Sequence, residues 1–511
     1  MTLSTQDPYL NLPRWLLFTA LGALALRLWI AVALPITGDE AFFYWWGVYP
    51  DWGYSDHPPM VGWLIWLMRT LFGEATWAIR LPIVLLPLAV GGLVWWAFKP
   101  LNRERAAWAA LLIWLAPLNW ITALITTDTP LIFWSVLSAA LLLRAERRAQ
   151  VDGGTLGLYA LSGLTLGCAF LSKYFSVVLG LAYLVYFALY RRERWKAFVL
   201  LVLCALPGPA INIAWNMDHG WSNIMFNAIN RNEDAVFEVR KPFMYLGMLA
   251  YLLTPALLWL GWKHRAALRE TARQQRLLAL LLVVPLIFFA LLSFKKVVGL
   301  HWVLSFYPFA FALYALALPP AALKTASKGL AWFTGAHVVL VLGVSFTTLD
   351  QWAGKPGYTS FVRAFRTPEL LAQVRTPDSV LMANAYSPAA VYGYVLQQYV
   401  PVFGPGKFHA RQDDQLVDYA VYQGQTIRVL MADAPDLAEY SPYFESVRAF
   451  TVQQSGVTFH VVEGRNFNYE AYRQGVLGEV FKRYYNIPSW LPMTGCPYCV
   501  RYCGQVQCPK P

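Results

Sequence analysis

The sequence predicts an all-α polytopic membrane protein that carries a small α/β domain at its C-terminal end. Of the 511 residues, 58% are hydrophobic and only 14% are charged, whereas soluble domains hold about 25% charged residues. Long apolar runs follow one another up to residue 349, and from residue 350 the pattern changes to short alternating segments. We therefore expect a membrane domain over 1–349 and a smaller domain over 350–511.

A run of about 20 apolar residues is long enough to cross a bilayer as a helix. By this criterion the sequence holds about eleven spans. They cover residues 14–36, 78–98, 106–125, 129–144, 155–172, 174–190, 197–214, 242–261, 277–294, 302–318 and 329–349. The first run lacks a small-residue cleavage site at its end, so we expect a membrane helix there and no cleaved signal peptide.

Basic residues gather in alternate loops, and this pattern predicts the orientation. The basic loops are 99–105, 144–148, 191–196, 263–276 and 324–328. By the positive-inside rule they face the cytoplasm, which places the N-terminus inside and the C-terminal domain in the periplasm or outside the cell. The formal net charge of +12 is thus explained by topology, and we expect membrane lipids as partners and no nucleic acid.

The C-terminal region reads as a mixed α/β domain. Short strands are expected at 379–383, 400–403 and 427–432, and a hairpin over 447–452 and 458–463 around Gln454-Ser455-Gly456. Residues 468–485 have the pattern of an amphipathic helix.

Four of the six cysteines lie in the tail, in CPYCVRYCGQVQC. An oxidising compartment favours disulfides there, while the C-x2-C spacing leaves a metal site as the alternative. Sequence cannot choose among the three pairings of Cys496, Cys499, Cys503 and Cys508. Cys168 and Cys204 lie in apolar spans and read as packing residues.

The candidates for chemistry all lie on the outward-facing side. Acidic groups at a membrane edge are costly unless they have a function, and residues 37–63 hold several of them directly after the first span, in what we expect to be an active-site loop. The outward-facing candidates are Asp39, Glu40, Asp56, His57, Asp128, Lys173, His219, Arg231 and His301.

These residue types suit transfer of a sugar from a lipid carrier. A carboxylate can act as general base on an acceptor hydroxyl or amine, and Lys, Arg and His can bind and stabilise a departing phosphate. A polyprenyl-phosphate donor fits this face better than a nucleotide sugar, because nucleotide sugars are cytoplasmic. Two other classes stay open: a transporter or lipid flippase, whose ionisable groups would lie near the bilayer midplane, and a membrane scaffold.

An ordered series of motifs resembles the integral-membrane glycosyltransferases of the C-type fold. The series is Gly38-Asp39-Glu40-Ala41, Asp56-His57-Pro58-Pro59, Thr127-Asp128-Thr129-Pro130, Ser172-Lys173-Tyr174 and Trp215-Asn216 with His219-Gly220-Trp221. It is similar to the bacterial branch that contains the lipid A aminoarabinose transferases, akin to the protein O-mannosyltransferases. The resemblance covers roughly residues 10 to 350.

The resemblance implies roles for individual residues. Asp39 resembles the catalytic base, with Glu40 beside it as an orienting or acceptor-binding group. Lys173 resembles a lysine that binds donor phosphate, and Asp128 the second acidic position of the superfamily. Asp56-His57 stands where the aminoarabinose enzymes have Glu-Lys, an acidic metal ligand and a donor-binding lysine.

Because Asp56-His57 replaces that Glu-Lys pair, the resemblance does not decide whether the protein binds a divalent metal. No other cofactor is expected. The resemblance thus implies a bacterial inner-membrane hexosyl or pentosyl transferase with a lipid, glycan or protein acceptor. The expected donor-phosphate set is Lys173, His57, His301 and Arg231, and the acceptor or metal candidates are Asp56, Asp128 and His219.

Each residue also has a structural interpretation. Asp39 and Asp128 are good helix caps, and Asp56 can initiate the turn before two prolines. Lys173 can extend to the membrane interface. The histidines can serve as interfacial hydrogen-bond donors, and Arg231 can bind lipid headgroups.

Overall fold

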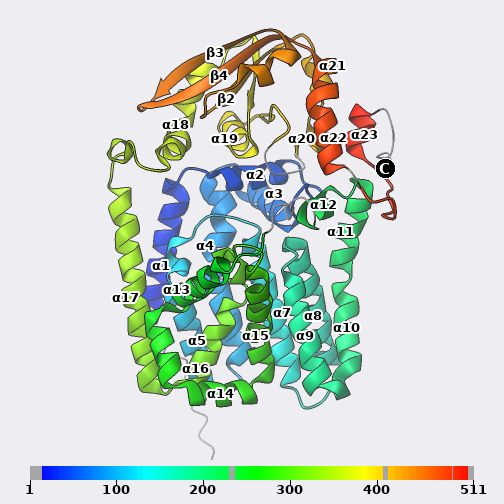
Figure 1. Cartoon of the computed structure of the whole chain (residues 1–511). Helices are drawn as coiled ribbons and strands as arrows, with labels where there is room; N and C mark the ends of the chain where they lie inside the picture. The colour runs from blue at the N-terminus through cyan, green and yellow to red at the C-terminus, as the bar shows by residue number, and fades with distance from the viewer. Residues whose placement is uncertain (1–13, 229–235, 407–411, 486, 504–511) are drawn as a thin grey trace, which may run out of the picture.

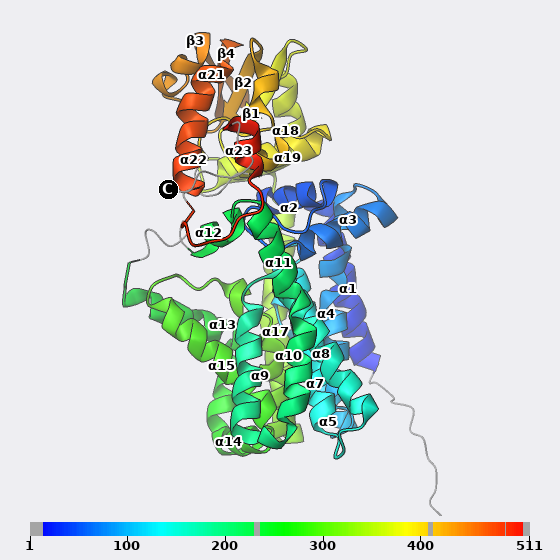
Figure 2. The ribbon, with the colours of Figure 1, turned by 90° about the vertical axis from the view of Figure 1, so that its right-hand side faces the viewer.

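The computed structural model describes residues 14–228, 236–406, 412–485 and 487–503. An upright bundle of helices carries an α/β domain on one of its ends (Figure 1). We call this the domain end of the bundle, and the opposite end, which carries α14 (Arg265–Gln274), the basic end. Short helices lie between the bundle and the domain (Figure 2).

The bundle consists of helices of different lengths, and only the longer ones run from one end to the other. They are α1 (Arg14–Ala33), α4 (Thr76–Phe98), α5 (Arg103–Leu115), α7 (Asp128–Glu146), α8 (Gly153–Ser172), α9 (Ser176–Tyr190), α10 (Trp195–Ala205), α11 (Pro207–Asp218), α13 (Arg240–Lys263), α15 (Arg276–Ser293), α16 (Tyr307–Ala317) and α17 (Pro320–Ser345). Among the described residues, seven helices are long and apolar enough to cross a membrane, or up to eight with a bent pair. The chain is therefore a multi-pass membrane protein, and the expected count of about eleven is not confirmed.

Prolines explain why several predicted spans differ from the helices. The run 106–125 is broken because α5 ends at Leu115 and Ala116 precedes Pro117, a position that disfavours the helical region. A four-residue helix, α6 (Leu118–Ile121), follows. The run 302–318 yields only the 11 residues of α16, which begins at Tyr307-Pro308.

The expected loop over residues 37–77 contains two helices, which corrects the prediction. Helix α2 (Gly38–Val48) is bent by 83° from α1, and α3 (Met60–Phe72) follows it. A capping box of Thr37 and Glu40 starts α2. The Thr-x-x-Glu spacing is a sequence signal for a helix start and could have revealed α2.

The basic loops come together at the basic end. Arg105 donates a hydrogen bond to the carbonyl of Ala315 at 3.1 Å, and the Arg276 guanidinium lies 4.5 Å from the ring centre of Tyr190. One end of the bundle is thus rich in arginine, as the positive-inside pattern requires of a cytoplasmic face.

The C-terminal domain is built on a four-stranded sheet of order β1-β2-β4-β3. Its strands are β1 (Ser379–Ala383), β2 (Thr426–Met431), β3 (Phe444–Gln454) and β4 (Val457–Phe467). Strand β1 is parallel to β2, and the other pairs are antiparallel. The expected strand 379–383 and the hairpin are confirmed, whereas 400–403 contributes only an isolated bridge between Ala383 and Val402.

Helices cover both faces of this sheet. Helices α18 (Tyr358–Val374) and α19 (Tyr386–Leu396) pack on the face of Leu430 and Phe459. The opposite face packs against the expected C-terminal helix, which forms as α21 (Tyr469–Tyr472), a π-helical turn and α22 (Gly478–Tyr484). Helix α19 thereby lies between the sheet and α2, and it is the part of the domain nearest to the candidate site.

The cysteine tail includes a short helix, α23 (Pro497–Tyr502). Cys496 is disulfide-bonded, whereas Cys499 and Cys503 are free thiols. Cys508 lies outside the described residues. Cys168 and Cys204 are free, as expected of packing residues.

Candidate active site

Glu40, in the first turn of α2, forms a fully buried ion pair with Arg80 of α4. Arg80 Nη2 donates to Glu40 Oε2 at 2.6 Å and Nε to Oε1 at 2.8 Å, and neither side chain is exposed. Glu40 also accepts from the backbone N–H of Ile125, and Arg80 also donates to the carbonyl of Pro35. An acceptor would have to displace Arg80 to reach Glu40, so the geometry suits Glu40 to orienting α2 and not to binding an acceptor.

Asp39, one residue earlier, is exposed where Glu40 is buried. Its side chain is exposed at the N-terminal turn of α2. The hydroxyl of Tyr386, at the start of α19, donates to Asp39 Oδ1 at 3.4 Å. A carboxylate that is exposed on a rigidly held helix can meet a substrate without rearrangement of the fold.

Asp56 and His57 lie beside each other and against α2. His57 Nδ1 is 3.3 Å from Asp56 Oδ2, and Asp56 is buried. The imidazole ring lies about 6 Å from the rings of Phe43 and Trp46 of α2, at 6.3 and 6.2 Å. The structure thus brings this pair next to the helix that carries Asp39.

Lys173, in the turn between α8 and α9, is paired with Asp128 at the start of α7. The Lys173 ammonium donates to both carboxylate oxygens at 2.9 Å, and both side chains are nearly buried. The ammonium also lies 5.4 Å from the ring centre of Phe175. Lysine has three donor hydrogens, so a phosphate oxygen can share Lys173 while Asp128 acts as its counter-ion.

His301 is exposed on a short 3₁₀ helix (Leu300–Val303) near this turn. The next residue, Trp302, packs on Phe175 with ring centres 4.7 Å apart. His301 is therefore on a segment that adjoins the Lys173 turn. Arg231, the fourth residue of the expected phosphate set, lies outside the described residues.

Asparagines that the sequence interpretation missed join the Lys173 turn to the Asp56 segment. Asn223, in α12 (Ser222–Ala228), donates to the carbonyl of Tyr54 at 2.7 Å and accepts from the hydroxyl of Tyr174. Asn227 donates to the carbonyl of Asp56 at 2.7 Å. The four-residue spacing of these two asparagines places them on one helix face, a signal that could have identified them.

His219 belongs to a separate cluster with Asp51. Its ring stacks on Trp215 at 4.2 Å, and its Nε2 lies 3.8 Å from Asp51 Oδ2. Trp215 Nε1 donates to the same carboxylate oxygen at 2.9 Å. His219 is thus held by Asp51 and Trp215.

The described residues do not form a metal site. No group of three or more His, Cys, Asp or Glu side chains in that part of the chain could hold a metal ion. Asp56 and His57 together offer two such side chains, and Asp128 is paired with Lys173. No chemical step is therefore assigned to a metal.

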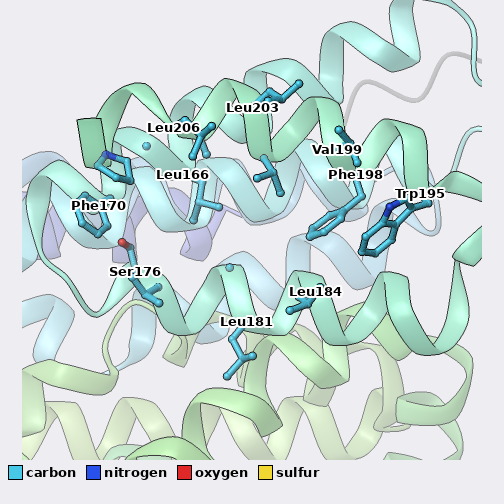
Figure 3. Close-up of a pocket in the computed structure, with 16 residues that line it drawn as sticks. Leu166, Phe170, Ser176, Leu181, Leu184, Trp195, Phe198, Val199, Leu203 and Leu206 are labelled. Atoms are coloured by element: carbon cyan, nitrogen blue, oxygen red, sulfur yellow. The ribbon is translucent and has the colours of Figure 1, made fainter. Parts of the chain in front are cut away.

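An apolar groove begins at the Lys173 turn and runs down the bundle. Its volume is about 660 Å³, and side chains of α8, α9, α10 and α11 line it. Figure 3 shows Phe170 and Ser176 toward one end and Trp195 toward the other. Lys173 lies in sequence between Phe170 and Ser176, so its turn is at the domain end of the groove.

At the edge of the site, Glu74 interacts with α2 and with Arg69. Arg69 donates to both Glu74 oxygens, at 2.7 and 2.6 Å, and this hydrogen bonding holds the pKa of Glu74 below its ordinary value. The backbone carbonyl of Glu74 accepts from the hydroxyl of Tyr394 of α19 at 2.8 Å. The C-terminal domain therefore contacts the segment between α3 and α4 as well as Asp39.

Comparisons with known proteins match this chain to membrane glycosyltransferases. A family model described as dolichyl-phosphate-mannose-protein mannosyltransferase matches residues 56–215. A lipid A galacturonosyltransferase of Rhizobium johnstonii is 28% identical over 251 residues, which is 44% of this chain and 52% of the relative.

A second relative is the undecaprenyl phosphate-alpha-4-amino-4-deoxy-L-arabinose arabinosyl transferase of Yersinia pestis, 27% identical over 264 residues, or 47% of this chain and 46% of the relative. The chain matches about half the length of these curated relatives. The crystal structure of ArnT from Cupriavidus metallidurans bound to undecaprenyl phosphate superposes with a TM-score of 0.66 at 16% identity, over 88% of this chain and 98% of that one. The superposition shows a shared fold.

Proposed function

We infer from its similarity in sequence and in fold that the chain is a membrane glycosyltransferase of the C-type fold, as its motifs predict. On that premise we propose that it transfers a sugar from a polyprenyl-phosphate carrier to a lipid, glycan or protein acceptor. The name of one relative, a lipid A galacturonosyltransferase, favours a lipid acceptor.

One observation carries this proposal: a series of contacts joins α2, the helix that carries Asp39, to the Lys173 turn. His57 lies against α2, Asp56 adjoins His57, and Asn227 and Asn223 bind the segment of Asp56. Asn223 then accepts from Tyr174, the neighbour of Lys173 in the chain. These contacts support a site in which the proposed general base and the proposed phosphate-binding lysine act together.

The proposed reaction is a single inverting displacement. Asp39 takes the proton of the acceptor hydroxyl or amine while that atom attacks the anomeric carbon. The bond between the anomeric carbon and the phosphate oxygen breaks in the same step, and the polyprenyl phosphate leaves. Lys173 with His57, and His301 from the adjoining segment, stabilise the charge on that phosphate. No covalent bond between sugar and enzyme forms.

The apolar groove supports a lipid carrier as donor. A polyprenyl chain is a long hydrocarbon, and the groove is lined almost wholly by apolar side chains, with Ser176 at its domain end. A phosphate at Lys173 would continue into a chain that descends along α8 and α9.

The proposal includes an orientation in the bacterial inner membrane, with the N-terminus in the cytoplasm and the C-terminal domain in the periplasm. It is supported by the arginine-rich basic end and by the positive-inside rule. A phosphatase that works only in the periplasm should be active when it is fused to the C-terminus. If that fusion is inactive, and a reporter that works only in the cytoplasm is active at the same position, the orientation is the reverse of the one proposed.

Purified protein and a panel of polyprenyl-phosphate sugars test the function. We expect release of polyprenyl phosphate, together with a glycosylated product, from one donor in the presence of a matching acceptor. If the donor sugar lipids instead cross the bilayer of proteoliposomes unchanged, the protein is a flippase and the proposal is wrong.

A further inference from the structure

The start of α19 lies directly over the start of α2, although the two helices belong to different domains. The Tyr386 hydroxyl donates to Asp39 Oδ1 at 3.4 Å, and the Tyr386 ring meets the ring of Phe42 edge-on at 5.0 Å. The proposed general base therefore has a hydrogen-bond donor that comes from the C-terminal domain.

The two helices pack closely enough to fix the start of α19 against the start of α2. A Cβ atom added to Gly38 would lie 1.7 Å from Ser387 Oγ and 2.8 Å from Ser387 Cβ. Real Cβ atoms essentially never approach other atoms within 3.0 Å. Glycine at position 38 is thus what allows α19 to approach the turn that carries Asp39.

Contacts continue along the whole of α19. Trp45 Nε1 donates to the carbonyl of Ala390 at 3.3 Å, and the Tyr394 hydroxyl donates to the carbonyl of Glu74 at 2.8 Å. The contact of Tyr386 with Asp39 is one of a series, so the docking of the domain determines where the Tyr386 hydroxyl lies.

We infer that Tyr386 is a positioning residue for Asp39, and that the C-terminal domain thereby completes the active site. The phenol hydrogen bond occupies one carboxylate oxygen and limits the rotation of the side chain. The other oxygen is left to take the acceptor proton. This inference rests on the proposed function of Asp39 as general base.

The inference is tested by comparing the kinetics of the full-length wild type, Tyr386→Phe and Tyr394→Phe. All three are measured with the donor and acceptor that the wild type uses. Tyr386→Phe removes the hydroxyl but keeps the ring on Phe42. We expect kcat to fall about tenfold or more, the order expected for loss of a hydrogen bond to a charged group, with the KM for donor unchanged. The melting temperature should stay within a few degrees of the wild-type value.

Tyr394→Phe is the matched control, because it removes a hydroxyl of the same helix that also bonds across the domain boundary but does not contact Asp39. If both variants lose the same fraction of kcat, Tyr386 only holds the domain in place, and the inference is overturned. Wild-type kcat in Tyr386→Phe overturns it as well.

A second measurement does not depend on transferase activity. A fluorotyrosine placed at position 386 gives a ¹⁹F resonance that reports on the hydroxyl's partner. We expect this resonance to shift in Asp39→Asn and to stay in place in Asp51→Asn, since Asp51 contacts Trp215 and not Tyr386. An unshifted resonance in Asp39→Asn would refute the contact itself. A wild type that transfers no sugar from any donor, with the shift still present, would refute the proposed function and leave a purely structural contact.

Discussion

Asp39 and Glu40 are neighbours in sequence and differ in almost every physical respect. Asp39 is exposed and meets one hydroxyl, whereas Glu40 is fully buried and bound by two nitrogens of Arg80. The sequence predicts a function for this acidic pair, because charge at a membrane edge requires a reason. It could not predict which of the two is buried, since Arg80 is 40 residues away and only the fold brings it to Glu40.

Replacement of Glu40 should therefore damage the fold. Glu40→Gln leaves the Arg80 guanidinium buried without its carboxylate, and breaking one partner of a buried pair costs about 3–5 kcal/mol. We expect a clearly lower melting temperature in detergent. Asp39→Asn, the isosteric change at the next residue, serves as the control and should melt like the wild type. Equal melting temperatures for Glu40→Gln and wild type would show that the pair does not hold α2.

For the remaining site residues, too, the sequence identifies candidates but not the partners that the fold brings to them. Lys173 and Asp128 were both recognisable as candidates, but their direct pairing at 2.9 Å was not, because they come from the ends of different helices. The spacing of Asn223 and Asn227 places them on one helix face but does not identify their partners, and Tyr386 carries no sequence signal as a site residue. Asn223 and Tyr386 both act through partners more than 40 positions away.

At the scale of elements, the sequence predicted best where local signals were strong. The β3–β4 hairpin and the strand 379–383 follow from alternation and turn residues. The spans were predicted less well, since hydropathy reports a long apolar run but not the break before Pro117 or the short α16. Helix α2 was missed although the spacing of Thr37 and Glu40 marks its start.

The sheet holds a buried charge that makes its stability sensitive to acid. Glu463 of β4 is buried and accepts hydrogen bonds from Arg428 at 2.6 Å and Arg448 at 2.9 Å. Burial raises the pKa of Glu463, but these hydrogen bonds outweigh it and leave the pKa below its ordinary value of 4.5. A lowered folded-state pKa contributes stability above the ordinary value, and this contribution is lost as the pH falls through the lowered one.

Glu463→Gln should accordingly lower the melting temperature of the domain at neutral pH. The difference from wild type should shrink as the pH falls below 4.5, because the wild-type carboxylate then loses its charge. Glu445→Gln, on the exposed side of β3, is the control and should follow the wild-type curve. A difference that stays constant down to pH 3 would show that Glu463 contributes packing and not charge.

At the scale of the whole molecule, the C-terminal domain is docked across the candidate site and not merely tethered to the bundle. Gln412 accepts from the hydroxyl of Ser55, and the backbone N–H of Thr494 donates to the carbonyl of Met217. With α19 on α2, these contacts hold the domain on both sides of the Asp56 segment. Such contacts join residues hundreds of positions apart, so no local pattern in the sequence could predict them.

The close approach of Gly38 and Ser387 provides a test of this docking. Gly38→Ala should reduce transfer and lower the melting temperature, because overpacking of this kind costs about 1–3 kcal/mol. Adding Ser387→Gly removes both atoms that the new Cβ would meet within 3.0 Å and leaves the Cα atom of residue 387 at 3.5 Å. We therefore expect the double variant to regain most of the lost activity. A double variant as impaired as Gly38→Ala would mean that the two helices are not packed against each other in the working enzyme.

The most direct test of the central claim is the release of polyprenyl phosphate by Asp39→Asn, measured beside the wild type with the same donor and acceptor. If Asp39 is the general base, the variant should lose at least about a hundredfold in kcat, bind the donor with near wild-type affinity and melt at the wild-type temperature. Turnover at the wild-type rate would remove Asp39 from the mechanism and contradict the account.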